Sequence, residues 1–271
     1  MLEPTAGADH HHQPAPGERC RDDPDTLPRR KPLYPGQSVL ALSAIYNEES
    51  KVAALAERFV DGLVDEIVIV NDGSTDRSAD ILREHGITVI DQPHLGLGAA
   101  IKRGIRYARD HGFTIAVLLA GNGKDDPREI PKLLAPILND GADYVQGSRF
   151  LPGGSAPNTP VFRLIAIKFL SLLFSLYCRK RCTDLTNGFR AYRLSLFDDP
   201  RINIWQDWLD NYECEYYLHF KVHTLGYKVT EVPVSKTYPM QKGVKYSKIK
   251  PITGWWHMLR PFILLGLHIK K

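Results

Sequence analysis

Short apolar runs alternate with amphipathic segments through the first half of the chain. The run Val39–Ile45 is almost wholly apolar and 67–70 is β-branched, as in buried strands. Apolar residues with helical spacing follow the first run, at Val52, Leu55 and Phe59. We therefore expect strands over 39–45, 67–70, 87–90, 114–119 and 143–145. Helices are expected over 48–60, 98–109 and 127–138, and from a cap at 74–76 through 83.

This alternation predicts an α/β fold, with a mixed, mainly parallel sheet flanked by helices. In open sheets of this type, ligands bind at the carboxyl ends of the strands. The loops expected to carry function are therefore 46–48, 71–76, 91–98, 120–127 and 147–155.

Beyond residue 155 the pattern is less regular. It predicts a helix over 161–178, strands over 188–194 and 228–234, and a helix over 212–225, followed by a basic loop over 236–250. Residues 254–269 are apolar but interrupted by Pro261, and 1–37 are rich in proline and lack apolar periodicity. We thus expect a disordered tail over 1–37, one α/β domain over 38–250 and an amphipathic segment over 251–271.

The 271 residues distribute their charge unevenly. The formal net charge is −1 for residues 1–37, −3 for 38–235 and +8 for 236–271. A basic end usually has an anionic partner, but no accompanying motif predicts nucleic acid binding. No apolar run is expected to reach the ~18–20 residues of a membrane span, and no secretory signal is expected. The four cysteines favour free thiols in a reducing compartment over a zinc site.

The most informative segment is 70–76, which reads Val-Asn-Asp-Gly-Ser-Thr-Asp. Asp72 follows a predicted buried strand, and Gly73 and Ser74 open the next helix. Acceptor oxygens and close backbone approach at this place suit a base or a ribose, while a capped turn is the alternative. The segment gains weight from Tyr-Asn-Glu at 46–48 and from Gly-Leu-Gly at 96–98.

Together these motifs resemble family 2 glycosyltransferases. The segments 147–150 (Gly-Ser-Arg-Phe), 183–190 (Thr-Asp-Leu-Thr-Asn-Gly-Phe-Arg) and 231–234 resemble the branch that uses dolichyl or polyprenyl phosphate acceptors. The resemblance covers residues 38–250 and implies a GT-A, Rossmann-like fold. A Rossmann dehydrogenase is disfavoured, because Ile101 replaces the third glycine of its fingerprint.

The resemblance also implies a nucleotide-sugar donor and an inverting single displacement. It implies that the donor is bound by Tyr46, Glu48, Asp72, Gly73, Ser74, Gly98, Asn122, Lys242 and Lys248. The two lysines belong to a loop that closes over the donor diphosphate in the family.

One departure from the family concerns its Asp-x-Asp motif, which holds Mg²⁺ or Mn²⁺ on the diphosphate. The two carboxylates are replaced by Ala120 and Asn122, and Lys124 lies two positions farther on. Three interpretations are open: Lys124 supplies part of the missing positive charge, Asn122 forms a shifted metal site with Asp125 and Asp126, or catalysis has been lost. Asp126 is equally suited to cap the following helix.

Candidates for the acceptor side lie in the second half of the chain. Guanidinium groups match phosphate oxygens, so Arg149 and Arg163 are candidates for an acceptor phosphate. The resemblance implies that Asp184 lies near the reacting centre, with Arg190 beside it also a candidate for the phosphate. Glu215 matches the base of relatives with hydroxyl acceptors, and an exposed helix carboxylate is its alternative. A phosphate nucleophile needs no strong base.

Two apolar segments predict contact with a membrane surface. In 161–179, Lys168, Ser171, Ser175 and Arg179 fall within roughly a quarter of a helical wheel. In 254–269, tryptophans and apolar residues accompany basic ones, as at lipid interfaces. We expect a peripheral protein on the cytoplasmic, inner face of the membrane, with a buried core helix as the alternative for 161–179.

The sequence therefore predicts a hexosyltransferase of cell-envelope glycan biosynthesis, with a nucleotide-sugar donor and a polyprenyl phosphate acceptor. One alternative is transfer to a hydroxyl of a lipid-linked or cell-surface glycan. The other is a degenerate nucleotide-sugar-binding protein. The resemblance implies Mg²⁺ or Mn²⁺ as the cofactor, and the replacement of the Asp-x-Asp carboxylates by Ala120 and Asn122 puts that cofactor in question.

Overall fold

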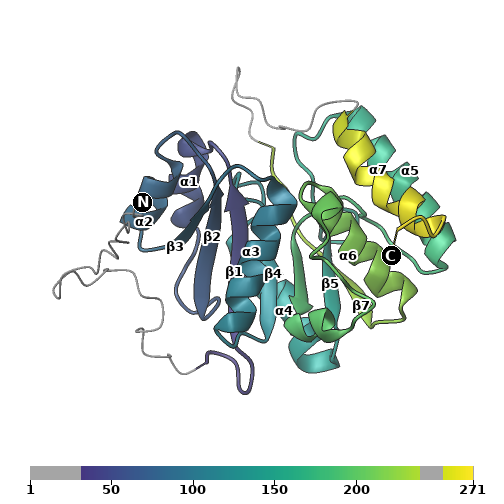
Figure 1. Ribbon diagram of the computed structural model, residues 1–271, viewed down its shortest axis with the longest axis horizontal. Helices are drawn as coiled ribbons and strands as arrows, with labels where there is room; N and C mark the ends of the chain where they lie inside the picture. The colour runs from purple at the N-terminus through teal and green to yellow at the C-terminus, as the bar shows by residue number, and fades with distance from the viewer. Residues whose placement is uncertain (1–31, 239–252, 271) are drawn as a thin grey trace, which may run out of the picture. The chain divides into compact units, whose positions relative to one another are not determined.

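The computed structural model describes residues 32–238 and 253–270, and in this part of the chain a seven-stranded sheet forms the centre (Figure 1). Its strands follow the order β3-β2-β1-β4-β6-β5-β7. They are β1 (Val39–Ile45), β2 (Glu66–Asp72), β3 (Thr88–Gln92), β4 (Ile115–Leu118), β5 (Tyr144–Ser148), β6 (Arg190–Arg193) and β7 (Val229–Pro233). Strand β6 runs antiparallel to β4 and β5, and the other pairs are parallel. The predicted mixed, mainly parallel sheet is confirmed.

Helices cover both faces of the sheet. Helices α3 (Leu97–Asp110) and α6 (Glu213–Thr224) pack on the face that carries Leu40 and Leu42 of β1. Helices α1 (Glu49–Ala56), α2 (Ser78–Glu84) and α4 (Ile130–Asp140) pack on the opposite face, with Val39 and Ala41. Successive side chains of a strand point to opposite faces, so the apolar run of β1 supplies both layers.

Helix α5 (Val161–Cys178) lies beside α7 (Thr253–Gly266) at one edge of the molecule (Figure 1). Its inner side is buried at Ile167, Ser171 and Phe174. Ser171 Oγ accepts a hydrogen bond from the Leu185 N–H at 3.0 Å, and Ser175 Oγ donates one to the Cys182 carbonyl at 3.0 Å. The serines of the predicted polar quarter therefore bind the protein body. The outer side exposes a row of apolar residues: Val161, Phe162, Ile165, Phe169, Leu172, Leu173 and Leu176.

By length and composition, α5 is long and apolar enough to cross a membrane, which corrects the expectation that no segment reaches that length. Arg163 and Lys168 interrupt the apolar run, but the 18-residue helix keeps a mean hydropathy of 1.9. The helix nevertheless packs one side against the α/β body, from Ile167 to Phe174.

Helix α7 continues through Pro261, where the sequence predicted an interruption. Phe262 packs against Phe174 of α5 and Tyr216 of α6, with ring centroids 5.2 and 5.8 Å apart. These contacts, and the burial of Leu265, stabilise the helix next to the position where proline removes a backbone donor.

Residues 32–37, which the sequence assigned to the tail, contact the α/β body. The Tyr34 hydroxyl donates a hydrogen bond to the Leu63 carbonyl at 2.9 Å, and the Leu33 N–H donates one to Asp65 at 2.7 Å. The folded part therefore includes 32–37, and the rest of the predicted tail lies outside the described residues.

Candidate active site

A cleft of about 800 Å³ opens at the carboxyl ends of the parallel strands. Its walls come from the loops after β1, β3, β4 and β5, from Asp72 at the end of β2, and from α5, α6 and the segment after β7. The predicted site residues that line it are Tyr46, Glu48, Asp72, Asn122, Lys124, Arg149, Arg163 and Glu215. The fold thus brings together side chains that are up to 169 positions apart in the sequence.

Asp72 holds the loop that follows β3. Its buried carboxylate accepts hydrogen bonds from Gln92 Nε2 at 2.7 Å and from the backbone N–H groups of Leu95 and Gly96 at 2.9 and 3.0 Å. Its Oδ2 lies 2.8 Å from Nδ1 of His94. Most of the acceptor capacity of the Asp72 carboxylate is therefore used inside the protein. Asp72, which the sequence predicts to bind the nucleotide, thus also positions one wall of the cleft.

His94 is a cleft residue that the sequence did not single out. Its ring stacks on Tyr46, with centroids 4.0 Å apart and 19° between the planes. Gly73 permits this close approach, because a Cβ there would lie 2.7 Å from the His94 backbone nitrogen, at a φ of +74°. The stacked pair gives the cleft an aromatic wall. The one signal for His94 in the sequence was its place in the 91–98 loop, which was expected to carry function.

The turn after β4 commits both of its carboxylates to protein contacts. Asp125 is fully buried, and its oxygens accept hydrogen bonds from the Lys236 ammonium at 2.6 Å and the Ala120 N–H at 2.9 Å. Asp126 accepts from the Arg128 N–H at 3.0 Å and pairs with the Arg128 guanidinium at 2.6 Å, which lowers the pKa of Asp126. The predicted cap at Asp126 is confirmed.

These residues do not fit a divalent cation, which prefers several oxygen ligands. Asp125 bonds inside the protein, Asp126 bonds to Arg128, and the side-chain oxygen of Asn122 accepts from the Lys124 N–H at 3.3 Å. Within the described ranges 32–238 and 253–270, no three His, Cys, Asp or Glu side chains gather as ligands. The shifted metal site considered from the sequence is not assembled.

Lys124 lines the cleft and is 7% exposed. Burial lowers its pKa to about 8, and the neighbouring charges of Lys236, Arg163 and Lys51 act in the same direction, against that of Asp125. Its ammonium lies 4.7 Å from the centroid of the Tyr238 ring. A buried cation surrounded by other cations is a favourable site for an anion.

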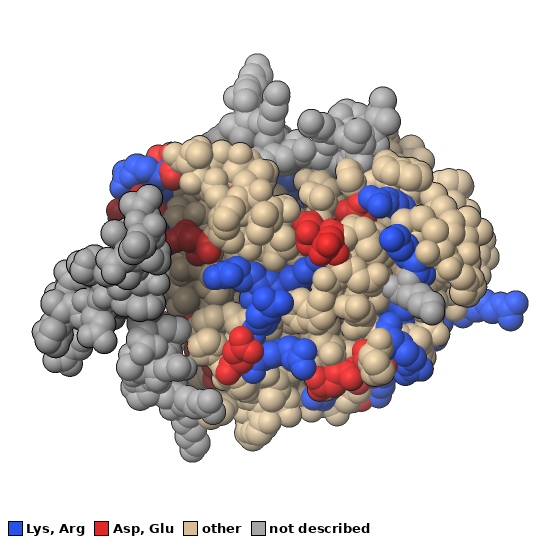
Figure 2. Space-filling view, in the orientation of Figure 1, with Lys and Arg blue, Asp and Glu red and all other residues tan. Residues whose placement is uncertain are grey.

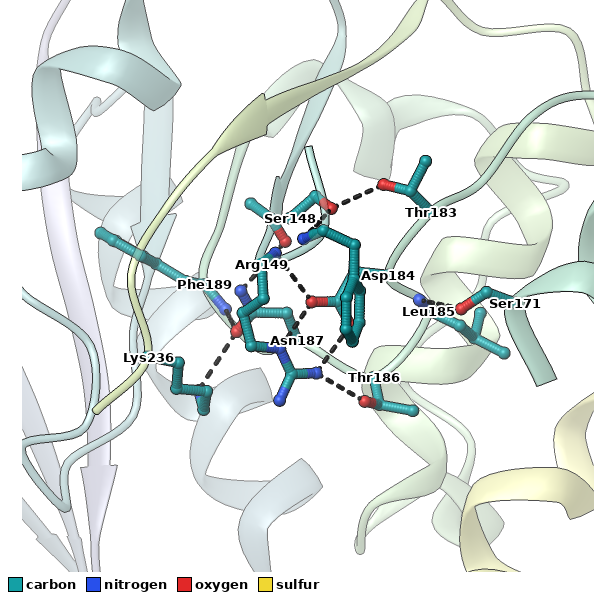
Figure 3. Close-up of polar contacts among 12 residues, drawn as sticks. Ser148, Arg149, Ser171, Thr183, Asp184, Leu185, Thr186, Asn187, Phe189 and Lys236 are labelled. Atoms are coloured by element: carbon teal, nitrogen blue, oxygen red, sulfur yellow. Dashed lines mark hydrogen bonds and ion pairs between the residues drawn. The ribbon is translucent and has the colours of Figure 1, made fainter. Parts of the chain in front are cut away.

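Arg149 is held rigidly by Asp184 (Figure 3). Arg149 Nε and Nη2 donate to the two Asp184 oxygens at 2.6 and 2.7 Å, and Nη2 also donates to Thr186 Oγ1 at 2.9 Å. Among the described residues, Arg149 Nη1 has no protein acceptor. Arg149 lines the cleft while Asp184 is fully buried behind it. Asp184 therefore positions the arginine, one step away from the cleft.

The loop carrying Asp184 is itself anchored. Glu231 of β7 accepts from the backbone N–H groups of Thr183 and Asp184 at 2.8 and 3.2 Å. Burial raises the pKa of Glu231. The 231–234 segment, noted in the sequence, thus supports the guanidinium through two layers of hydrogen bonds.

Arg190 lies beneath the cleft wall and is 2% exposed. Its guanidinium donates to the carbonyls of Asn187 and Glu215, each at 2.8 Å. It therefore joins the 185–188 loop to the start of α6. The Glu215 side chain is half-buried on the cleft wall against Gly188, where a Cβ would lie 2.9 Å from Oε1.

The remaining predicted donor ligands are placed differently from the cleft residues above. Ser74 Oγ accepts from the Asn47 N–H at 2.9 Å and so joins the first two loops. Gly98 permits tight packing, because a Cβ there would lie 2.0 Å from the Leu209 carbonyl oxygen. Lys242 and Lys248 lie outside the described residues.

Comparisons with known proteins agree with this geometry. Residues 42–199 match the family model for glycosyl transferase family 2. The chain is 28% identical over 233 residues to the polyprenol monophosphomannose synthase of Mycolicibacterium smegmatis, covering 82% of this chain and 84% of that protein. It is also 28% identical over 244 residues to the undecaprenyl-phosphate mannosyltransferase of Micrococcus luteus, covering 82% and 97%.

A solved structure shares the fold. Glucosyl-3-phosphoglycerate synthase from Mycobacterium tuberculosis, in complex with Mn²⁺, UDP and glucosyl-3-phosphoglycerate, matches with a TM-score of 0.63. The match covers 87% of this chain and 81% of that chain, at 19% identity. Because the family model spans more than half of the sequence and includes the loops that build the cleft, this protein belongs to glycosyl transferase family 2.

Proposed function

We propose that this protein transfers a hexose from a nucleotide-sugar to a polyprenyl phosphate at a membrane surface. The observation that carries the proposal is that α5 joins the cleft to an exposed apolar surface. Arg163 and Ile167 of α5 line the cleft, while Phe162 and Phe169 of the same helix are 69% and 58% exposed. A lipid-borne phosphate needs a cation inside the cleft and an apolar surface beside it. The two curated relatives named above act on acceptors of this class by name.

The donor half of the cleft lies at the loops after β1 and β3. The stacked rings of Tyr46 and His94 offer a wall to the base of the nucleotide, and Glu48 offers acceptor oxygens. An acceptor phosphate oxygen then attacks the anomeric carbon, and the bond from that carbon to the donor β-phosphate breaks. The nucleoside diphosphate leaves with inversion. No base is required, because the phosphate nucleophile is already anionic.

Arg149 and Arg163 are the proposed ligands of the acceptor phosphate. Both line the cleft, and the ion pair with Asp184 fixes Arg149 before the acceptor arrives. A pre-oriented guanidinium loses little conformational entropy on binding a phosphate oxygen. Arg149 Nη1 is the group available for that contact.

The proposed membrane-docking surface consists of the exposed sides of α5 and of residues 256–269. Its α5 part is the apolar row described above, and Trp256, Ile263, Leu267 and Ile269 are also exposed. The edge of the molecule at α5 and α7 is mostly uncharged in Figure 2. Exposed basic residues at 179–181 suit anionic headgroups. Because α5 packs one side on the α/β body, we infer that it lies in the membrane interface and does not span the bilayer. We propose the cytoplasmic face, as expected from the sequence.

Transfer is tested with the full chain, undecaprenyl phosphate in liposomes and a panel of labelled UDP- and GDP-sugars. Label is expected to enter the organic phase with undecaprenyl phosphate and not with undecaprenol. Docking is tested separately by cosedimentation with anionic liposomes, which should weaken at high salt and in the Phe169→Ser/Leu173→Ser variant. Equal labelling of both lipids would contradict the proposed acceptor.

Glu215 favours a second candidate, transfer to a hydroxyl. Its carboxylate lies on the cleft wall, where a base for a hydroxyl acceptor is needed. The Glu215→Gln variant separates the two candidates. Transfer to polyprenyl phosphate should fall less than about threefold, whereas a hydroxyl acceptor that needs the base should lose about 100-fold.

A further inference from the structure

The end of the cleft at the β4 turn is rich in cations. Lys124 and Arg163 both lie against the ring of Tyr238, with Nζ and the guanidinium carbon 4.7 and 5.8 Å from its centroid. The charges of Lys236, Arg163 and Lys51 repel that of Lys124. Two of these cations already have carboxylate partners, Lys236 in Asp125 and Lys51 in Glu48. Cationic side chains are therefore concentrated at this end of the cleft, where an anion would contact several of them.

The β4 turn does not offer carboxylates to hold a metal ion that could bind the diphosphate in place of these cations. Ala120 contributes no side-chain oxygen, and its backbone N–H donates to Asp125. Asp125 has no exposed surface, and Asp126 does not line the cleft. A cation held here would have to displace the Lys236 ammonium from Asp125, and that exchange would leave a buried lysine without its carboxylate.

We propose that Lys124 binds the diphosphate of the donor directly, and that transfer by this protein needs no divalent cation. This inference rests on the proposed function, because it concerns the donor of that reaction. Negative charge grows on the β-phosphate oxygen as its bond to the anomeric carbon breaks. Lys124 donates a hydrogen bond to that oxygen and stabilises it without transferring a proton.

Burial of Lys124 favours its interaction with the donor phosphate. An ammonium removed from water is stabilised only by charged or hydrogen-bonding partners, and charge-assisted bonds are stronger in a site that excludes water. Lys124 is 7% exposed before the donor binds, so little further desolvation of its ammonium is needed. The backbone of Lys124 is fixed by the hydrogen bond from the Thr237 N–H to its carbonyl, at 3.0 Å.

The test is isothermal titration of the full chain with UDP and with GDP, in EDTA and in MnCl₂ or MgCl₂. The tighter of the two nucleotides should bind equally well, within about twofold, with chelator and with either metal. The Lys124→Met variant should lose roughly tenfold or more in affinity, and Lys124→Arg should retain most of it. Lys132→Met, at an exposed lysine of α4, is the matched control. Thermal melting confirms that each variant folds.

A nucleotide that binds only with Mn²⁺ or Mg²⁺ would overturn the metal-independence. Unchanged affinity in Lys124→Met would overturn the role of Lys124. The proposed acceptor fails separately: metal-free binding without labelled lipid would reject the acceptor and leave this inference standing. Labelled lipid that forms only with metal would support the proposed acceptor and reject the metal-independence.

A second variant tests the same claim by gain of function. Ala120→Asp/Asn122→Asp adds two carboxylates beside Lys124. In EDTA this variant should bind the nucleotide more weakly than the native chain, because the carboxylates repel the diphosphate. Added Mn²⁺ should restore binding in the variant and leave the native chain unchanged. A native chain that responds to Mn²⁺ as the variant does would contradict the inference.

Discussion

The ammonium of Lys236 lies 2.6 Å from Oδ1 of Asp125, across 111 positions of sequence. Asp125 is fully buried and Lys236 is 8% exposed, so the pair joins the β4 turn to the segment after β7 inside the protein. Lys236 also donates to Asn187 Oδ1 at 3.1 Å (Figure 3). One lysine therefore holds together three of the segments that surround the cleft.

Breaking this buried pair should destabilise the protein strongly. Lys236→Met leaves the Asp125 carboxylate buried without its cation and should lower the free energy of unfolding by about 3 kcal/mol or more. The double variant Lys236→Met/Asp125→Asn should recover part of this loss, because the unpaired charge is gone. Urea denaturation measures each value. As a control, Lys132→Met breaks the exposed pair with Glu129 and should cost less than about 1 kcal/mol. Equal losses at the two sites would contradict this account.

Removing the support of Arg149 should impair the acceptor step selectively. Asp184→Asn removes the charge that pairs with the Arg149 guanidinium and weakens its orientation. The kcat/KM for polyprenyl phosphate should therefore fall roughly tenfold or more. The Kd for UDP or GDP should change less than about twofold, because Asp184 lies behind the acceptor side. Arg201→Met, which removes an exposed pair with Asp199, is the matched control. A variant that loses nucleotide affinity and keeps its acceptor kinetics would refute the assignment.

Donor affinity should decline at alkaline pH. The pKa of Lys124 is lowered to about 8 by burial and by Lys236, Arg163 and Lys51. The ammonium is charged below that pH and is lost as the pH rises through it, so the Kd for the nucleotide should increase above about pH 8. Lys124→Arg stays charged and should flatten the profile. The measurement is titration with UDP or GDP from about pH 7 to 9. Parallel profiles for the two proteins would show that another group titrates.

Acid should destabilise the fold through His223. Burial lowers the pKa of His223 to about 4, with the Lys180 and Arg190 charges acting in the same direction, against 6.5 as the ordinary value. Between these values the unfolded chain binds a proton that the folded chain excludes. Stability from this group is therefore complete above about pH 6.5 and falls by about 3 kcal/mol as the pH drops to 4.

The His223→Phe variant tests this sign. It keeps an aromatic ring beside Phe174 and His219 and should lose less stability than the native chain between about pH 6.5 and 4. The neighbouring His219, whose pKa is also lowered by burial, accounts for part of the remaining loss. Urea denaturation at several pH values gives the two slopes. A steeper slope in the variant would contradict the account.

The sequence predicted the α/β layers well because the strands and most helices between residues 39 and 148 carry a local apolar pattern. It also predicted which loops meet, since parallel strands bring their carboxyl ends to one edge. It did not predict that Asp184 and Arg190 lie behind the cleft wall, because burial of a charged side chain depends on partners such as Arg149 and the Asn187 carbonyl. The Asp125–Lys236 pair and the Tyr46–His94 stack were not predicted either, because both form between segments that are distant in the sequence.

The central claim is tested most directly by one transfer assay in EDTA, using labelled UDP- and GDP-sugars and liposomes that contain undecaprenyl phosphate or undecaprenol. The account predicts that label from one donor enters undecaprenyl phosphate and leaves undecaprenol unlabelled. It further predicts that Lys124→Met greatly reduces the rate while Lys132→Met does not. Absence of labelled undecaprenyl phosphate with every donor, both in EDTA and after addition of Mn²⁺, would contradict the account.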